Sequence, residues 1–132
     1  MSKIDGNEIA EVYREDLKRE VENLKKEGVE PTIAPVLVGN DPQARVYFRT
    51  KKKLAEILGI EYRGVRLNEG ISEEELIERL TELNNNPSVH GLFIELPLPE
   101  GLSLKEIKNW ITPNKDVDCI NPVNRGQLLS EG

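Results

Sequence analysis

Segments with a helical apolar period alternate with short apolar runs along the 132 residues of this chain, and this alternation constrains the fold more than any other feature. The predicted helices cover residues 7–26, 42–58, 73–83 and 104–111, and the predicted strands cover 32–38, 60–67 and 90–96. The polar connections between them are short. The order αβαβαβα predicts an α/β fold, a three-layer α/β/α arrangement with a small, mainly parallel sheet.

Local patterns add expectations about helix ends and packing. Asn7 is predicted to cap the first helix. The inner face of the second helix is predicted to consist of Val46, Thr50, Leu54 and Ile57. Pro35 has no N–H group, so the first strand is expected to be frayed there or unpaired on its donor side. No element is predicted in the tail from Gln127 onward, and the chain is expected to be cut at a domain boundary.

Composition excludes classes of function. The net charge of −6 argues against a general nucleic-acid binder, because phosphate contacts need a basic surface. Cys119 and His90 are the single cysteine and histidine, so no disulfide framework and no metal site are expected, and His90 is interpreted as structural. No stretch approaches the roughly 20 apolar residues of a membrane span, and residues 1–5 lack a signal-peptide pattern. We therefore expect a cytoplasmic protein.

Residues 91–99 read Gly-Leu-Phe-Ile-Glu-Leu-Pro-Leu-Pro, and they place a carboxylate where a strand ends. Glu95 closes the apolar run, and Pro97 and Pro99 prevent further ladder pairing. Open α/β sheets bind ligands at the carboxyl ends of their strands, so Glu95 is a candidate site residue. A strand that merely ends in a proline-rich loop would explain the same pattern.

Two further pairs could carry chemistry. Tyr47 and Lys51 share a face of the second helix, where an aromatic ring can stack on a flat heterocycle and a lysine can shuttle protons. A boundary tyrosine beside solvated lysines is the alternative. Asp116 and Asp118 would point the same way in an extended segment and could bind an amino-heterocycle. A turn carrying two solvated acids explains them equally well.

Six segments in one order carry a family resemblance. They are residues 4–10 (Ile-Asp-Gly-Asn-Glu-Ile-Ala), 38–42 (Val-Gly-Asn-Asp-Pro), 47–51 (Tyr-x-x-x-Lys), 91–99, 115–118 (Lys-Asp-Val-Asp) and 121–126 (Asn-Pro-x-Asn-x-Gly). The chain resembles the N-terminal, folate-binding catalytic domain of bifunctional methylenetetrahydrofolate dehydrogenase/methenyltetrahydrofolate cyclohydrolase, an N-terminal domain of the amino-acid-dehydrogenase-like type. That family of one-carbon metabolism oxidises methylenetetrahydrofolate with NAD(P) and hydrolyses the methenyl product to formyltetrahydrofolate.

The resemblance implies roles for individual residues. Lys51 would relay protons during hydrolysis, with Tyr47 and Glu95 beside it in the catalytic group. Tyr47 would stack on the folate, and Asp118 would hold the pterin through its ring nitrogens and amino group. The folate slot would be lined by Leu96, Pro97 and Pro99.

The chain departs from the family pattern at five positions. Glu95 stands where the family usually has glutamine, and a carboxylate there would keep Lys51 charged or share in the proton transfer itself. Ala44 replaces a usual serine, and Cys119 replaces a glycine, which should alter the pocket wall. Asn121 and Val123 replace the commoner histidine and tyrosine.

Residues 1–132 are expected to form one catalytic-type domain without the family's NAD(P)-binding Rossmann domain. No cofactor is then expected to bind this chain alone, and dehydrogenase activity is not expected from it. A family helix from the far carboxyl terminus would be missing, which should expose an apolar patch. Two alternatives stay open, a related tetrahydromethanopterin enzyme domain and a catalytically silent or engineered scaffold. A homodimer is also left open.

Overall fold

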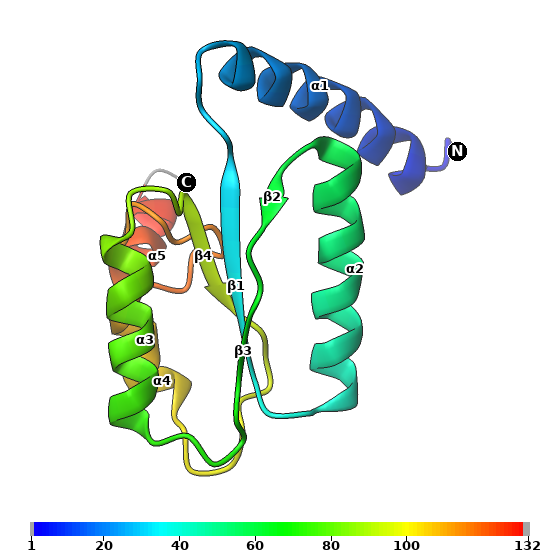
Figure 1. The fold of residues 1–132 in the computed structure, drawn as a ribbon. Helices are drawn as coiled ribbons and strands as arrows, with labels where there is room; N and C mark the ends of the chain where they lie inside the picture. The colour runs from blue at the N-terminus through cyan, green and yellow to red at the C-terminus, as the bar shows by residue number, and fades with distance from the viewer. Residues whose placement is uncertain (1, 131–132) are drawn as a thin grey trace.

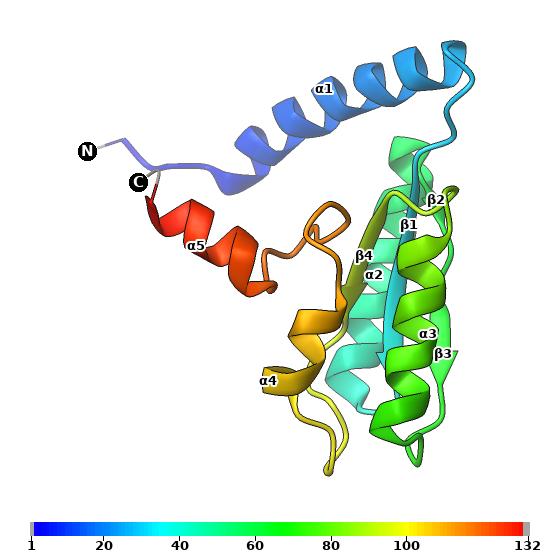
Figure 2. The ribbon, with the colours of Figure 1, turned by 90° about the vertical axis from the view of Figure 1, so that its left-hand side faces the viewer.

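The computed structural model describes residues 2–130 and confirms the α/β class (Figure 1). The elements are α1 (Gly6–Lys26), β1 (Thr32–Val38), α2 (Pro42–Leu58), β2 (Glu61–Tyr62), β3 (Val65–Leu67), α3 (Glu73–Asn85), β4 (Gly91–Ile94), α4 (Leu104–Ile107), a 3₁₀ turn (Lys108–Trp110) and α5 (Pro122–Ser130). All named strand pairs are parallel. Figure 2 looks onto the face covered by α3 and α4, with α2 behind the sheet.

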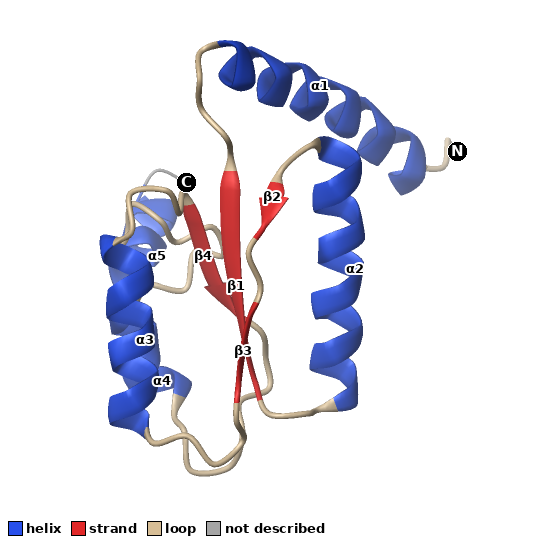
Figure 3. Cartoon of the chain, viewed as in Figure 1, coloured by secondary structure: helices blue, strands red, loops and turns tan. Residues whose placement is uncertain are grey.

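Strand β1 is the centre of the sheet and pairs with each of β2, β3 and β4 (Figure 3). The carbonyls of Pro31 and Ile33 accept hydrogen bonds from the β2 side, whereas those of Thr32 and Val36 accept from His90 and Glu95 on the β4 side. The backbone groups of alternate β1 residues therefore point to opposite edges of the strand. The nitrogen of Pro35 points to the edge that pairs with β2 and β3.

The structure shows what the proline does to this edge. β1 is continuous and almost wholly buried, so it is not frayed at Pro35. Residues 63–64, which lie between β2 and β3, leave the ladder opposite Pro35. The donor side is thus unpaired, and the single strand predicted over 60–67 is divided into two short strands because one ladder donor is missing.

The hydrophobic core lies between the sheet and the helices α3 and α4. Alternate residues of β1 and β4 point into it, as expected for strands buried on both faces. Its fully buried side chains include Val36, Leu76, Leu80, Leu92, Ile107 and Ile111. A capping box starts α3, since Ser72 and Glu75 exchange hydrogen bonds there.

The predicted inner face of α2 is wrong. The helix buries Ala44, Ala55 and Leu58 against the sheet. Val46 and Ile57 are 60% and 59% exposed. Small alanine side chains let a helix backbone approach the strands closely, and this contact outweighs the larger apolar area of the other face. The stripe that holds Leu54 and Ile57 instead faces a groove beside α1.

Helix α1 lies away from the three layers, near one end of α2 (Figures 1 and 2). Asp5, and not Asn7, caps it, because the Asp5 carboxylate accepts from the N–H groups of Asn7 and Glu8. Val21 is its one buried residue. Apolar side chains along the rest of the helix are exposed, among them Ile9, Val12, Tyr13 and Leu17.

The prediction that the tail from Gln127 onward contains no element is also wrong, because α5 covers residues 122–130. Asn121 accepts a hydrogen bond from Val123 N–H at 2.9 Å, and Pro122 occupies the first helical position. An asparagine followed by proline is a helix-start signal that the sequence does contain. No helix among residues 2–130 is long and apolar enough to cross a membrane.

Candidate functional site

A lysine and a glutamate from different elements meet where β4 ends. Glu95 follows β4 directly, and its N–H donates to Val36 O at 2.9 Å, so the ladder holds its backbone in place. Its side chain is only 4% exposed. Lys51 reaches it from the buried side of α2, with 3.0 Å between Nζ and Glu95 Oε1. The structure therefore brings together two of the residues predicted to carry catalysis.

The Lys51 ammonium also contacts an aromatic ring that the sequence did not single out. Its Nζ lies 4.4 Å from the centre of the Phe93 ring. Phe93 precedes Glu95 by two residues, so both side chains lie on the α2 face of the sheet. The lysine side chain is 39% exposed, which leaves one side of the charged group open to solvent. Period-two alternation in 91–95 was the signal that could have found Phe93.

Glu95 has unused hydrogen-bonding capacity. Its Oε1 is buried and has no hydrogen-bond donor within residues 2–130, because the contact with Lys51 is an ion pair without hydrogen-bond alignment. Buried acceptors are usually satisfied, and exceptions concentrate at functional sites. The carboxylate can therefore accept a proton or a hydrogen bond from a ligand or water that reaches Lys51.

Tyr62 forms the floor next to this pair. Its hydroxyl donates to Phe48 O at 2.6 Å, and the two rings pack edge to face with centres 5.4 Å apart. Burial, and then the negative charge of Glu95, raise the pKa of Tyr62 above its ordinary value. The phenol consequently stays neutral, and its proton is used in holding α2 on the sheet.

The other predicted residues are distributed around the pair. Tyr47 lies one helical turn before Lys51 and is 49% exposed. Pro97 and Pro99 line a concavity of about 320 Å³ between the carboxyl end of β1 and the start of α2. Leu96 is exposed and does not line it. Lys51 and Glu95 do not line it either, so the prolines and the ion pair form separate parts of the surface.

The two aspartates that the sequence pairs have different environments. Asp116 bridges to Leu92, and its carboxylate accepts from the N–H groups of Ile120 and Asn121 and from Asn124 Nδ2. Asp118 follows in a bend, exposed, and within residues 2–130 its carboxylate accepts no hydrogen bond. The segment is a turn, so Asp116 organises the loop and Asp118 alone is free to bind.

The pKa of Asp116 reflects this role. Burial by itself raises it, but hydrogen bonds from the backbone of Asn121, the side chain of Asn124 and the backbones of Ile120 and Asp118 lower it further than burial raises it. The net pKa lies below the ordinary value for aspartate. The carboxylate is thus ionised at neutral pH and holds the loop that carries Asp118.

Two positions where the chain departs from the family pattern do not form a pocket wall. Ala44 is wholly buried on the sheet-facing side of α2. Asn121 is buried and uses both ends of its amide, donating to Ile111 O at 2.8 Å and accepting from Val123 N–H. The expectation that Ala44 alters the wall is therefore wrong. His90 has the structural role predicted for it, since its Nδ1 accepts from Thr32 N–H at 3.1 Å.

The start of α2 does not fit the pyrophosphate of a dinucleotide, and the described residues offer no metal-binding cluster. The turn from β1 into α2 begins with Gly39, but Asp41 caps the helix by accepting from Ala44 N–H at 2.9 Å. A pyrophosphate there would meet this carboxylate instead of free amide groups. Within residues 2–130, no group of three or more histidine, cysteine or acidic side chains could hold a metal ion.

Comparison with known proteins finds one consistent group. Residues 4–118 match the family described as tetrahydrofolate dehydrogenase/cyclohydrolase, catalytic domain. The chain is 44% identical over 127 residues to Bifunctional protein FolD 2 of Desulfitobacterium hafniense, covering 96% of this chain and 45% of that protein. It is 42% identical over 126 residues to Bifunctional protein FolD of Bacillus subtilis, with 96% and 44% covered. It thus spans less than half the length of these relatives.

Solved structures agree. The bifunctional methylenetetrahydrofolate dehydrogenase/cyclohydrolase FolD of Campylobacter jejuni superposes with a TM-score of 0.92 at 37% identity, over 94% of this chain and 44% of that one. The Trypanosoma brucei dehydrogenase-cyclohydrolase, solved with NADP and an inhibitor, gives 0.89 at 31% identity, over 96% and 43%.

Proposed function

Because this chain belongs to the tetrahydrofolate dehydrogenase/cyclohydrolase catalytic-domain family, we propose that residues 1–132 are its folate-binding catalytic domain and act on a methenyl- or methylene-folate. The observation that carries this proposal is the Lys51–Glu95 ion pair, solvent-accessible on the lysine side, at the carboxyl end of β4. Such a pair can carry acid–base chemistry, and α/β sheets bind their ligands at this edge.

The pair can carry the proton transfers of methenyl-bridge hydrolysis. Water must lose a proton as its oxygen bonds to the bridge carbon, and the nitrogen released from that carbon must gain one. Lys51 can donate a proton from its ammonium group and Glu95 can accept one, so a proton passes through the pair without a change in its net charge. The second proton of the water is released to solvent, which balances the reaction.

The remaining roles are assigned by surface position. Tyr47 offers an exposed ring on the Lys51 side of α2, suited to stacking on a flat pterin. Asp118 offers a free carboxylate, suited to the ring nitrogens and amino group of that pterin. We assign Leu96, Pro97 and Pro99 to the apolar wall of the folate slot, with the two prolines at its concave part.

The dehydrogenase reaction belongs to the whole protein of the family and needs NAD(P). The described residues offer no dinucleotide-binding turn, so none of them is assigned to the cofactor. For this domain we propose substrate binding and the proton transfers of cyclohydrolase chemistry.

Titration with a methenyl-folate analogue tests the proposal. The folded chain should bind the analogue saturably, and Lys51→Ala should retain binding while lowering the hydrolysis rate at least about 10²-fold, the usual contribution of a positioned acid or base. Lys53→Ala, an exposed lysine on the same helix, is the control and should leave the rate unchanged. Absence of binding to the folded chain would overturn the proposal.

A further inference from the structure

A second, strongly basic cavity lies beside α2, and neither Lys51 nor Glu95 lines it. It measures about 370 Å³ and lies between α2 and the edge formed by β2 and β3. Phe48 and Tyr62 line its floor, and its rim carries Arg45, Arg49, Lys52 and Arg66. No acidic side chain lines it, although the whole chain has a net charge of −6.

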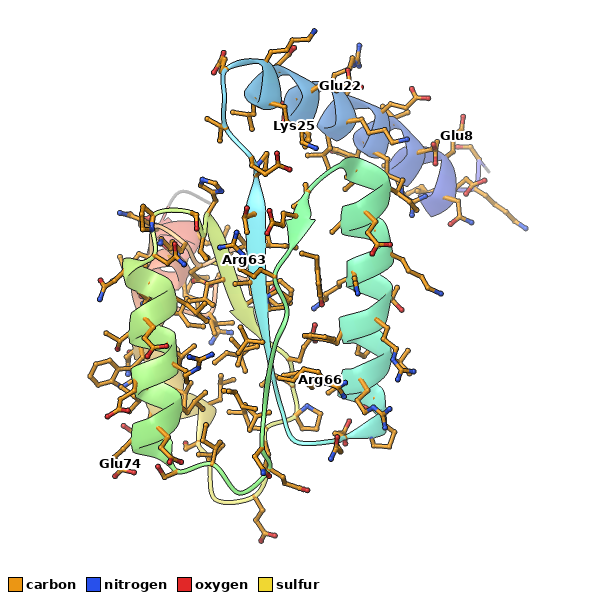
Figure 4. All side chains as sticks on the ribbon, viewed as in Figure 1. Glu8, Glu22, Lys25, Arg63, Arg66 and Glu74 are labelled. Carbon is orange, nitrogen blue, oxygen red and sulfur yellow. The ribbon has the colours of Figure 1, made fainter. Side chains whose placement is uncertain are left out.

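The secondary structure concentrates these cations. Arg45, Arg49 and Lys52 follow one another at helical spacings of four and three residues, so they share one face of α2. Arg66 lies between Val65 and Leu67, which pack against the core on the α3 side. Strand alternation therefore directs Arg66 to the opposite face, and Figure 4 shows it reaching from β3 toward α2.

The charges are not compensated within the described chain. None of the cations on the rim forms an ion pair within residues 2–130. Like charges one turn apart on a helix repel each other, so this arrangement weakens the isolated helix. A multivalent anion between them would remove that repulsion.

Arg45 gives an independent sign of a missing ligand. Its Nε is buried and has no hydrogen-bond acceptor within residues 2–130. An unmet donor on a charged group is costly, because the group has lost its water without gaining a partner. A phosphate or carboxylate oxygen is the acceptor that a guanidinium binds best, often through two parallel hydrogen bonds.

The floor of the cavity is tightly packed and fixes the shape of the cavity. A Cβ atom at Gly64 would lie 2.5 Å from Phe48 Cζ, so the Phe48 ring packs directly on the backbone of residue 64. Tyr62 already donates its proton to Phe48 O, and the cations therefore remain as the groups that can recognise a ligand. A cavity held by a helix and a sheet can keep charged groups in place without a mobile loop.

We propose that this basic cavity binds a small molecule with two or more anionic groups, phosphates or carboxylates, through Arg45 and Arg66, with Arg49 and Lys52 at the rim. The site is distinct from the proposed folate site and does not depend on it. Tyr62 borders both sites, but neither Lys51 nor Glu95 lines this cavity.

Isothermal titration of the full chain with pyrophosphate at constant ionic strength tests the site. We expect one saturable site, whose affinity falls about tenfold or more in Arg66→Gln, because one guanidinium–oxyanion contact is lost. Lys52→Gln should also weaken binding, whereas Lys53→Gln, adjacent on α2 but outside the cavity, should not. Arg66 is exposed on a short strand, so its variant should stay folded, which circular dichroism can check.

A parallel titration with citrate separates the two ligand chemistries. Tighter binding of pyrophosphate assigns the site to phosphates, and tighter binding of citrate assigns it to carboxylates. Absence of saturable binding by both anions, or equal losses in Lys52→Gln and Lys53→Gln, would overturn the proposal, because the attraction would then be a general effect of charge. Folate binding by the same preparation shows independently whether the proposed function holds.

Discussion

At the scale of single residues, Glu95 determines whether the pair with Lys51 contains a proton acceptor. It combines near-complete burial, an ion pair with Lys51 and an oxygen without a hydrogen-bond donor in the described chain. A neutral amide at this position could accept a hydrogen bond but could not take up a proton at neutral pH. The carboxylate therefore gives the pair a proton acceptor that glutamine cannot supply.

Replacing this carboxylate tests whether the acceptor is used. We expect Glu95→Gln to lower the rate of methenyl-folate hydrolysis by about 10- to 10²-fold, because the relay loses its acceptor while Lys51 stays in place. Glu100→Gln, an exposed glutamate five residues later, is the matched control. An equal or faster rate in Glu95→Gln would show that Lys51 works without the carboxylate.

Asp116 is the other residue whose charge has a defined effect. Its pKa is lowered in the folded state, so ionisation of this group stabilises the fold at pH values above the ordinary aspartate pKa of about 3.9. This contribution is lost as the pH falls from there through the lowered pKa of Asp116. Above that range the contribution does not change with pH.

Asp116→Asn should therefore reduce the free energy of unfolding at pH 7 by about 1–3 kcal/mol, the range for hydrogen bonds to a charged acceptor. At a pH below the lowered pKa, the difference from the unsubstituted chain should shrink. Urea unfolding at both pH values measures this change. Asp118→Asn is the control, since its exposed carboxylate contributes no such bonds, and a loss of stability equal to that of Asp116→Asn would contradict the assignment.

At the scale of elements, features encoded by adjacent residues were predictable. The α3 capping box, the bounds of β1 and the start of α2 after Asp41 all follow from residues within one turn of each other. The inner face of α2 was not predictable from apolar spacing, because the close approach of Ala44 and Ala55 to the sheet decides it. The role of Asp116 was not predictable for a similar reason. Its hydrogen-bond donors, Ile120, Asn121 and Asn124, are brought to its carboxylate only when the following segment folds back.

The orientation of α2 can be measured directly. The reference is Leu80→Ala, a core position on α3. It should lower the free energy of unfolding by about 2–5 kcal/mol, as usual for a buried leucine. Ile57→Ala should cost less than about 1 kcal/mol, because that side chain is largely exposed. Denaturant unfolding of the two variants gives the comparison. Equal losses would mean that the apolar stripe, and not the alanine face, packs on the sheet.

At the scale of the whole molecule, the three layers are compact but α1 adds an apolar surface outside them. Ile9, Val12, Tyr13 and Leu17 lie exposed along this helix. Neighbouring apolar side chains of this kind bind hydrophobic dyes and promote association. These side chains therefore form an exposed apolar patch on α1.

Leu17→Glu should reduce dye fluorescence and any concentration-dependent self-association, because it puts a charge into this surface. The free energy of unfolding should change by no more than about 0.5 kcal/mol, as for other surface positions. Fluorescence with a hydrophobic dye and sedimentation velocity provide the readouts. A loss of several kcal/mol would instead show that α1 is packed in the fold.

The central place of β1 also determines when the fold can be completed during synthesis. β1 emerges early, but its second edge pairs with β4, and the bond between Thr32 and His90 joins residues 58 positions apart. In a nascent chain, the edge of β1 that pairs with β4 therefore stays unpaired until residue 94 has left the ribosome. Long-range parallel pairing is slow to form, so closure of this edge should limit the folding rate, and until then the apolar residues of β1 stay open to aggregation.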